Sequence, residues 1–186
     1  MRFQEKIDGF LVRYLAYFNY KRYTKRLNLN AGEEILEVGS GGGNLSRFLV
    51  KELKEGSLTC LDSSRYSLHL ARKRLKNFTK IYFLLEDIIE TNLKQKYDKI
   101  LFCYVLHDIT KEERGKVISK CRNFLKSNGN ICIREPIRTE HGMPTEEIED
   151  LMTRANLIKI FSKEGYSFPL KGKIYEGIFQ NSTTLE

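Results

Sequence analysis

Short apolar segments alternate with amphipathic helical patterns along most of this chain, and this alternation restricts the fold more than any other feature. We expect strands at seven apolar runs: Ile35–Val38, Leu58–Leu61, Ile81–Leu85, Lys99–Tyr104, Ile131–Arg134, Leu157–Phe161 and Lys173–Phe179. We expect helices between them at Asn44–Leu53, Arg65–Leu75, Lys111–Leu125 and Thr145–Ala155, with a short turn or helix at Ile88–Leu93. Near-continuous apolar strands that alternate with helices are typical of a parallel sheet covered on both faces. The sequence therefore predicts an α/β fold with a doubly wound, mostly parallel seven-stranded sheet and helices on both faces.

The last two expected strands differ from the others because residues 163–171 between them show no helical pattern. Antiparallel strands need only a short connection, so we expect a hairpin at the sheet edge and an antiparallel last strand. No internal repeat is visible, and 186 residues with 41% apolar content suit one hydrophobic core. We expect a single domain over residues 30–186, preceded by an N-terminal segment of residues 1–29.

Composition excludes several classes of protein. The longest uninterrupted apolar run, Ile100–Leu106, is far shorter than the roughly 20 residues that a bilayer requires. The N-terminal stretch carries Glu5, Asp8 and Arg13, which is unlike a signal peptide, so a cytoplasmic location is expected. The four cysteines are scattered without a C-x-x-C pair, and neither a metal site nor a disulfide framework is expected.

The N-terminal segment has apolar residues at helical spacing: Phe3, Ile7, Phe10, Leu11, Tyr14, Leu15 and Phe18. An amphipathic helix is expected here, which either packs its apolar stripe on the domain or forms a lid over a site. The segment also mixes aromatic and basic residues: Tyr14, Tyr17, Tyr20, Lys21, Arg22, Tyr23, Lys25 and Arg26. This mixture, with a net charge of +8, suits an anionic or aromatic ligand and leaves RNA binding open as an alternative.

A glycine-rich loop follows the first expected strand, in the sequence Glu37-Val38-Gly39-Ser40-Gly41-Gly42-Gly43-Asn44. Glycines allow positive φ and let a ligand approach the backbone, while the following helix offers free N–H groups. The alternative is a flexible turn. Four glycines in five residues between a strand and a helix favour a ligand-binding loop.

Two carboxylates narrow the choice of ligand. Glu37 lies two residues before the first glycine, where it would repel the pyrophosphate of a nicotinamide cofactor and attract an ammonium group. Asp62 ends the second expected strand, where a carboxylate can accept hydrogen bonds from two ribose hydroxyls. The alternative for Asp62 is a helix N-cap, a role for which Ser63 and Ser64 compete.

The motif Glu-x-Gly-x-Gly-x-Gly after a strand, with an acid at the next strand's end, resembles the class I S-adenosylmethionine-dependent methyltransferases, over about Asn30 to Phe179. The resemblance implies a Rossmann-like fold and S-adenosylmethionine as methyl donor, with S-adenosylhomocysteine as product. It implies that Glu37 lies near the methionine ammonium and that Asp62 takes the ribose hydroxyls. The other implied donor-site residues are Gly39, Ser40, Gly41, Gly43, Ser63, Asp87, Ile88 and Tyr104. Asp87 would contact the adenine amino group and Ile88 the base; the alternative for Asp87 is a helix cap.

The sequence Leu106-His107-Asp108, with Glu135 after the next strand, resembles a narrower group, the small-molecule O-methyltransferases. The resemblance implies that His107 deprotonates the acceptor and that Glu135 orients it, and an unperturbed imidazole pKa of about 6.5 suits this role. The alternative for His107 is a surface or helix-start residue. The match is incomplete, because only about thirty residues precede the sheet and His141-Gly142-Met143-Pro144 stands where that group has a second acid.

The prediction is therefore an S-adenosylmethionine-dependent methyltransferase acting on a small-molecule acceptor. The alternatives are a methyltransferase acting on RNA or protein, a nicotinamide oxidoreductase, which Glu37 disfavours, and a catalytically inactive module that binds the donor. Two familiar motifs are missing after the fourth strand: neither Asn/Asp-Pro-Pro-Tyr, typical of amino-methylating nucleic-acid enzymes, nor a Pro-Cys nucleophile is found there.

Overall fold

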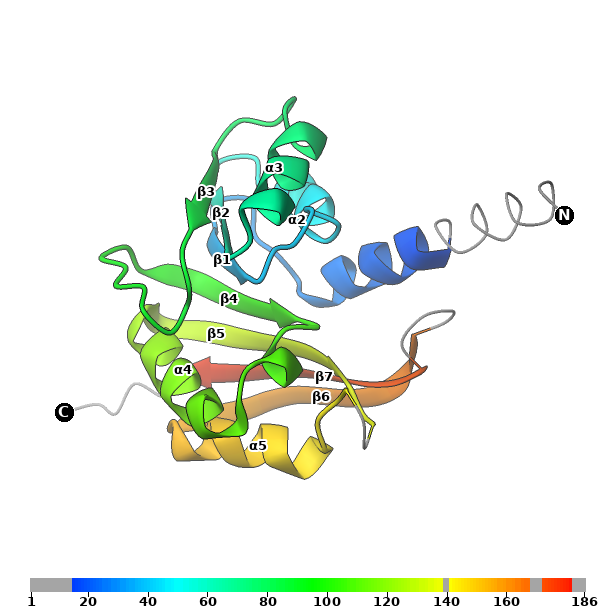
Figure 1. The fold of residues 1–186 in the computed structure, drawn as a ribbon, viewed down its shortest axis with the longest axis vertical. Coiled ribbons are helices and arrows are strands. Elements are labelled where there is room, and N and C mark those ends of the chain that lie inside the picture. The colour runs from blue at the N-terminus through cyan, green and yellow to red at the C-terminus, as the bar shows by residue number, and fades with distance from the viewer. Residues whose placement is uncertain (1–14, 139–140, 168–171, 182–186) are drawn as a thin grey trace, which may run out of the picture.

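The computed structural model describes residues 15–138, 141–167 and 172–181 (Figure 1). A seven-stranded sheet runs through it in the order β3-β2-β1-β4-β5-β7-β6. The strands are β1 (Glu34–Val38), β2 (Ser57–Asp62), β3 (Ile81–Leu85), β4 (Tyr97–Cys103), β5 (Leu125–Pro136), β6 (Leu157–Ser167) and β7 (Gly172–Asn181). All neighbouring pairs from β3 to β5 are parallel, and β7 is antiparallel to both β5 and β6. The predicted fold class, with its antiparallel last strand, is confirmed.

The helices lie on both faces of this sheet. They are a helix over residues 15–26, α2 (Ser46–Glu52), α3 (Arg65–Arg74), the short 3₁₀ helix η1 (Leu106–Asp108), α4 (Lys111–Asn123) and α5 (Thr145–Arg154). None of the helices in the described ranges is long and apolar enough to span a membrane.

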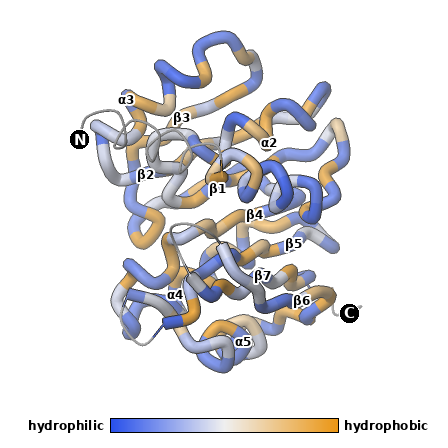
Figure 2. The backbone as a smooth tube through the Cα atoms, turned by 90° about the vertical axis from the view of Figure 1, so that its right-hand side faces the viewer, coloured by the Kyte–Doolittle hydropathy of each residue, from blue (hydrophilic) through white to orange (hydrophobic). Residues whose placement is uncertain are grey.

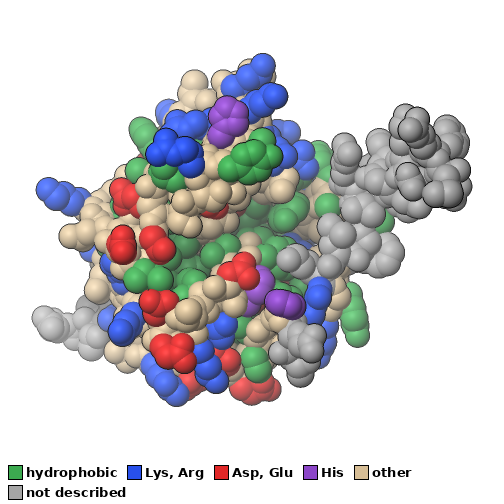
Figure 3. Space-filling view, viewed as in Figure 1, with side chains coloured by type: hydrophobic (Ala, Val, Ile, Leu, Met, Phe, Trp, Pro, Cys, Tyr) green, Lys and Arg blue, Asp and Glu red, His purple; other side chains and the backbone are tan. Residues whose placement is uncertain are grey.

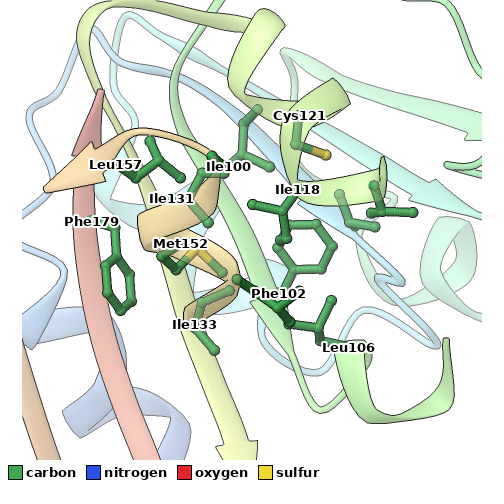
Figure 4. Close-up of a cluster of buried hydrophobic side chains, with 14 of the residues drawn as sticks. Ile100, Phe102, Leu106, Ile118, Cys121, Ile131, Ile133, Met152, Leu157 and Phe179 are labelled. Carbon is green, nitrogen blue, oxygen red and sulfur yellow. The ribbon is translucent and has the colours of Figure 1, made fainter. Parts of the chain in front are cut away.

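Two hydrophobic clusters hold the layers together, because alternate side chains of a strand point to opposite faces. In β4, Ile100 and Phe102 join the cluster covered by α4 and α5, whereas Leu101 joins the cluster covered by α2, α3 and the helix over residues 15–26. Figure 4 shows the first cluster, in which Ile118 of α4 and Met152 of α5 meet Ile131 and Ile133 of β5. Figure 2 shows the apolar stretches running along the central strands.

The boundaries of several elements differ from the sequence-based expectation. β5 begins at Leu125, where the expected helix was to end, and continues through polar residues 126–130 before the apolar run. β6 extends to Ser167 instead of ending at Phe161. Residues 126–130 of β5 and the mostly exposed end of β6 are largely polar, so an apolar pattern cannot reveal these extensions. Ile88–Leu93 contains a turn and no helix.

Residues 15–27 pack on the domain through aromatic and apolar side chains. Tyr17 contacts the Phe48 ring edge-on at 4.9 Å between centroids, and Tyr23 and Leu27 are buried in the second cluster. The apolar positions from Phe3 to Tyr14 lie outside the described residues, so the division into a 1–29 segment and a 30–186 domain stays a prediction. The packing role of the described part is visible in these contacts.

Candidate active site

The glycine loop after β1 adopts a conformation that side chains rarely tolerate. Gly39, Gly41 and Gly43 have φ values of 64°, 53° and 73°. A Cβ atom on Gly39 would lie 2.4 Å from a methyl carbon of Val105, so this glycine is required by packing against the turn after β4. A Cβ atom on Gly41 would meet no heavy atom within 4 Å, so this glycine borders open space that a ligand can occupy.

Glu37 lies at the end of β1 beneath this loop and is almost fully buried, with 3% of its surface exposed. The Ser46 hydroxyl, near the start of α2, donates a hydrogen bond of 2.5 Å to Oε2 of Glu37. Burial raises the pKa of Glu37 to about 8; Ser46 lowers it and the Asp62 charge raises it further. A buried carboxyl group of this kind gains its full charge when a cationic group binds beside it.

Asp62, at the end of β2, connects the glycine loop to the following helix. Its Oδ2 accepts the Gly41 N–H at 2.7 Å, and its Oδ1 accepts the Ser64 N–H at 2.9 Å. The N-cap of α3 is Ser64, whose hydroxyl accepts the Ser67 N–H, so the alternative of Asp62 as the helix cap is wrong. Each carboxylate oxygen of Asp62 has a lone pair left for a ligand hydroxyl.

A cavity of about 380 Å³ opens beside the strand ends. Figure 3 shows a hollow in this face with hydrophobic side chains in its floor and acidic side chains near its rim. Of the predicted donor-site residues, six line the cavity: Gly39, Asp62, Ser63, Asp87, Ile88 and Tyr104. Ile88 is buried with its side chain in the wall. Asp87 also accepts the Ile89 N–H at 2.9 Å within a turn, and no helix follows it, so the helix-cap alternative is wrong.

His107 and Glu135 form a close pair. Nδ1 of His107 lies 2.6 Å from Oε2 of the fully buried Glu135. Oε1 of Glu135 accepts the backbone N–H groups of Val105 at 2.9 Å and Leu106 at 2.8 Å, which anchors the turn after β4. The His107 side chain is 7% exposed and is outside the cavity lining, although its neighbours Val105 and Asp108 line it.

The second ring nitrogen of His107 faces the rim of the cavity. Nε2 lies 3.3 Å from Oδ1 of Asp108, a cavity-lining carboxylate whose side chain is 75% exposed. The surface-histidine alternative is therefore wrong for the side chain, which is nearly buried. The site is a histidine fixed on one side by a buried carboxylate, with an exposed acid next to its other ring nitrogen.

Contacts that connect β5 and β7 to the helix over residues 15–26 were not predicted from the sequence. Arg134 Nε donates to the Tyr104 hydroxyl at 2.9 Å, and Arg26 donates two hydrogen bonds of 2.7 Å to the Glu176 carboxylate. The signal for Arg134 was a charged residue that directly precedes Glu135 at the end of an apolar run. No comparable signal marked Glu176 as its neighbour. Among the described residues, no cluster of three or more His, Cys, Asp or Glu side chains is arranged to hold a metal ion.

Comparison with known proteins agrees with this architecture. A family model described as a methyltransferase domain matches residues 36–131, just over half of the chain. An uncharacterized methyltransferase of Geobacillus sp. (strain WCH70) is 28% identical over 131 residues, which cover 69% of this chain and 60% of the relative. The chain spans about 60% of the length of the curated relatives that it matches.

Two solved structures share the fold. The N-methyltransferase NodS from Bradyrhizobium japonicum WM9, in complex with S-adenosyl-L-homocysteine, matches with a TM-score of 0.74 at 18% identity, over 87% of this chain and 86% of that chain. A Burkholderia thailandensis 1,6-didemethyltoxoflavin-N1-methyltransferase matches with a TM-score of 0.75 at 12% identity, over 90% and 79%. With the family match, these structures confirm the predicted resemblance, and the chain belongs to the methyltransferase domain family of class I S-adenosylmethionine-dependent methyltransferases.

Proposed function

We propose that this chain transfers a methyl group from S-adenosylmethionine to a small-molecule acceptor. The observation that carries the proposal is the set of acids at three consecutive strand ends, two of which line one cavity. Glu37 lies under the glycine loop, while Asp62 and Asp87 line the cavity. A donor with an ammonium group, a ribose and an adenine needs a carboxylate at each of these places.

The residues present fit this donor. Open space in front of Gly41 and the remaining lone pairs of Asp62 suit a ligand pressed against the backbone. Glu37 would hold the ammonium group, Asp62 and Ser63 the ribose, and Asp87 and Ile88 the adenine. The bound donor supplies an electrophilic methyl group on a sulfonium, and the chain supplies the positioning that such an in-line displacement requires.

We propose a base role for His107 where the acceptor is a hydroxyl. The Glu135 carboxylate accepts a hydrogen bond from the protonated Nδ1 of His107, which fixes the orientation of the ring. Nε2 is then the nitrogen that takes the proton of the acceptor hydroxyl. The same arrangement stabilises the imidazolium that forms. Asp108, 3.3 Å from Nε2, then offers an exposed route for the proton to solvent. For an amine acceptor, correct positioning of the amine beside the methyl donor would matter more than a base.

The small-molecule acceptor is supported by the activity of structural neighbours such as the 1,6-didemethyltoxoflavin-N1-methyltransferase. RNA or protein acceptors and a donor-binding module without activity are outcomes of the test below. We also propose a reducing, cytoplasmic setting, because all four cysteines are free thiols and burial raises their pKa values.

The test has two steps. Calorimetry with S-adenosylhomocysteine should give a micromolar-range dissociation constant, and lack of binding would overturn the proposal. A screen for S-adenosylhomocysteine release should then compare small hydroxyl, amine and acid compounds with an RNA pool and a peptide pool. Turnover confined to the small compounds supports the proposal. Turnover with RNA or peptide alone, or donor binding with no turnover on any pool, contradicts the small-molecule assignment.

A further inference from the structure

A second, smaller hollow lies between the helix over residues 15–26 and the β6–β7 hairpin. Its volume is about 90 Å³, the size of one functional group and well below that of a whole-ligand pocket. Four basic side chains line it, Arg22, Arg26, Arg134 and Lys163, together with one carboxylate, Glu176. In Figure 1 this helix lies on the side of the sheet where β5 ends and β7 begins, the two strands that carry Arg134 and Glu176.

The one carboxylate that lines the hollow, that of Glu176, already contacts two of the basic side chains. Glu176 accepts two hydrogen bonds of 2.7 Å from Arg26, and its Oε1 lies 3.5 Å from Nη1 of Arg134. In the described part of the chain, no acidic side chain pairs with Arg22 or Lys163. Four positive charges therefore face one negative charge, and the hollow has an excess of positive charge.

Arg134 makes this hollow a fixed structure. Its side chain is 1% exposed, and it donates to the Tyr104 hydroxyl, to the Asn19 carbonyl at 3.3 Å and to the Ser167 hydroxyl at 3.4 Å. These contacts hold all three guanidinium nitrogens in place before any ligand arrives. A pre-positioned, poorly solvated guanidinium binds an anionic group more strongly than an exposed side chain does.

Tyr104 connects the hollow to the donor cavity. It lines the donor cavity, and its hydroxyl also accepts the hydrogen bond from Arg134 at 2.9 Å. A ligand held by its anionic end in the basic hollow is thus separated from the donor cavity by the Tyr104 and Arg134 side chains. A molecule anchored in the hollow would therefore have to pass over the Tyr104–Arg134 pair to reach the methyl donor.

We propose that the methyl acceptor is a small molecule with an anionic group, a carboxylate or a phosphate, that binds in this basic hollow. This inference rests on the proposed function, since it names the acceptor class of the same site. The small volume and the buried Arg134 fit one terminal anionic group. A nucleic-acid backbone would instead need a row of exposed cations that tracks several phosphates.

The test uses phenyl phosphate and benzoate as anionic probes and benzamide as the uncharged probe, each titrated by calorimetry with and without saturating S-adenosylhomocysteine. The variant Arg22→Glu/Lys163→Glu reverses two charges that line the hollow. The matched control Lys21→Glu/Lys25→Glu reverses two exposed charges on the same helix that do not line it. We expect the dissociation constants of the anionic probes for the wild-type chain and the control variant to agree within twofold. The Arg22→Glu/Lys163→Glu variant should bind these probes at least tenfold more weakly.

Three results would overturn the inference. Benzamide could bind as tightly as benzoate, or the two double variants could lose equal affinity for the anionic probes. The third result is an RNA 20-mer that binds in dependence on Arg22 and Lys163 while neither anionic probe binds. The ratio of phenyl phosphate to benzoate affinity tells which anionic group is preferred. Affinity for S-adenosylhomocysteine should be the same in all three proteins. If the wild-type chain does not bind S-adenosylhomocysteine, the proposed function fails, while the titrations without it still test the hollow.

Discussion

The region where β1 and β2 end at the glycine loop and the region where β5 and β7 meet the helix over residues 15–26 are built in different ways. On the first side, the decisive contacts join residues close in sequence: Ser46 to Glu37, nine residues apart, and Gly41 to Asp62, 21 apart. On the second side, Arg26 bonds to Glu176 across 150 residues and Arg134 to Asn19 across 115. The contacts around the glycine loop thus join segments that are near one another in the sequence, whereas the basic hollow forms only when distant segments have folded together.

The two sides also carry opposite charges. Acids line the donor cavity, including Asp62, Asp87 and Asp108, and arginines dominate the hollow beyond Tyr104. A cationic donor and an anionic acceptor would each meet a surface of complementary sign. Changes on the donor side should therefore affect donor affinity, and changes on the other side should affect turnover or acceptor binding.

The largest expected effect is on turnover and concerns His107, in the turn after β4. For a hydroxyl acceptor, His107→Ala should lower the single-turnover rate about 10²- to 10⁴-fold, the usual contribution of a positioned base. The wild-type rate should rise with pH as the imidazole loses its proton, and this rise should disappear in the variant. Affinity for S-adenosylhomocysteine should not change, because His107 is outside the cavity lining.

Two variants sharpen this prediction. Glu135→Gln keeps an oxygen for the Val105 and Leu106 N–H groups but weakens the hold on Nδ1, so it should cost less than His107→Ala. His69→Ala, on the exposed surface of α3, is the control and should have no effect. Full turnover in His107→Ala would show that positioning suffices and that the acceptor atom needs no base.

On the donor side, Gly41→Val should weaken S-adenosylhomocysteine binding at least a hundredfold. A side chain at φ +53° is strained and would fill the open space that the ligand needs. No protein atom lies within 4 Å of the added Cβ, so the fold should survive with about 1–2 kcal/mol of backbone strain. Calorimetry and thermal unfolding measure the two effects separately.

Two other glycines provide the comparison. Gly32→Val, also with no atom within 4 Å of its Cβ, lies in the turn before β1 and should leave binding unchanged. Gly39→Ala should instead reduce stability, because its Cβ would overlap Val105. Normal binding by Gly41→Val would mean that the loop only connects β1 to α2.

The glycine-loop region and the basic hollow also differ in how much of each could be predicted from the sequence. The positions of the strands along the chain and the acids at their ends were predictable, because buried strands are apolar runs and the loop carries its glycines in one stretch. The polar start of β5 and the end of β6 carry no such signal. The contact of Arg26 with Glu176 and the basic hollow depend on how the hairpin meets the helix over residues 15–26, which no local pattern encodes.

Asp62→Ala should weaken S-adenosylhomocysteine binding by more than tenfold. It removes a charged acceptor for the ribose and also frees the Gly41 and Ser64 N–H groups, a loss of about 1.5–3 kcal/mol for a charge-assisted hydrogen bond. The control is Asp98→Ala, in β4, which also accepts a backbone N–H, that of Glu34. Asp98→Ala should lower stability without changing affinity. Equal affinities of the Asp62 variant and the wild-type chain would remove Asp62 from the donor site.

The smallest expected effect on affinity, about tenfold, belongs to Glu37→Gln, which replaces the charged partner of the ammonium by a neutral one.

The same variant should be more stable than the wild-type chain at high pH. Burial raises the pKa of Glu37 from 4.5 to about 8, so the folded state holds a proton that the unfolded state releases between these pH values. Wild-type stability must therefore fall as pH rises from about 4.5 to about 8 and then level off, at about 1.4 kcal/mol for each pKa unit. The amide of the variant has no such proton to lose and still accepts the Ser46 hydroxyl. The difference in melting temperature between variant and wild type should grow over this range, and a constant difference would show that the Glu37 carboxyl ionises normally.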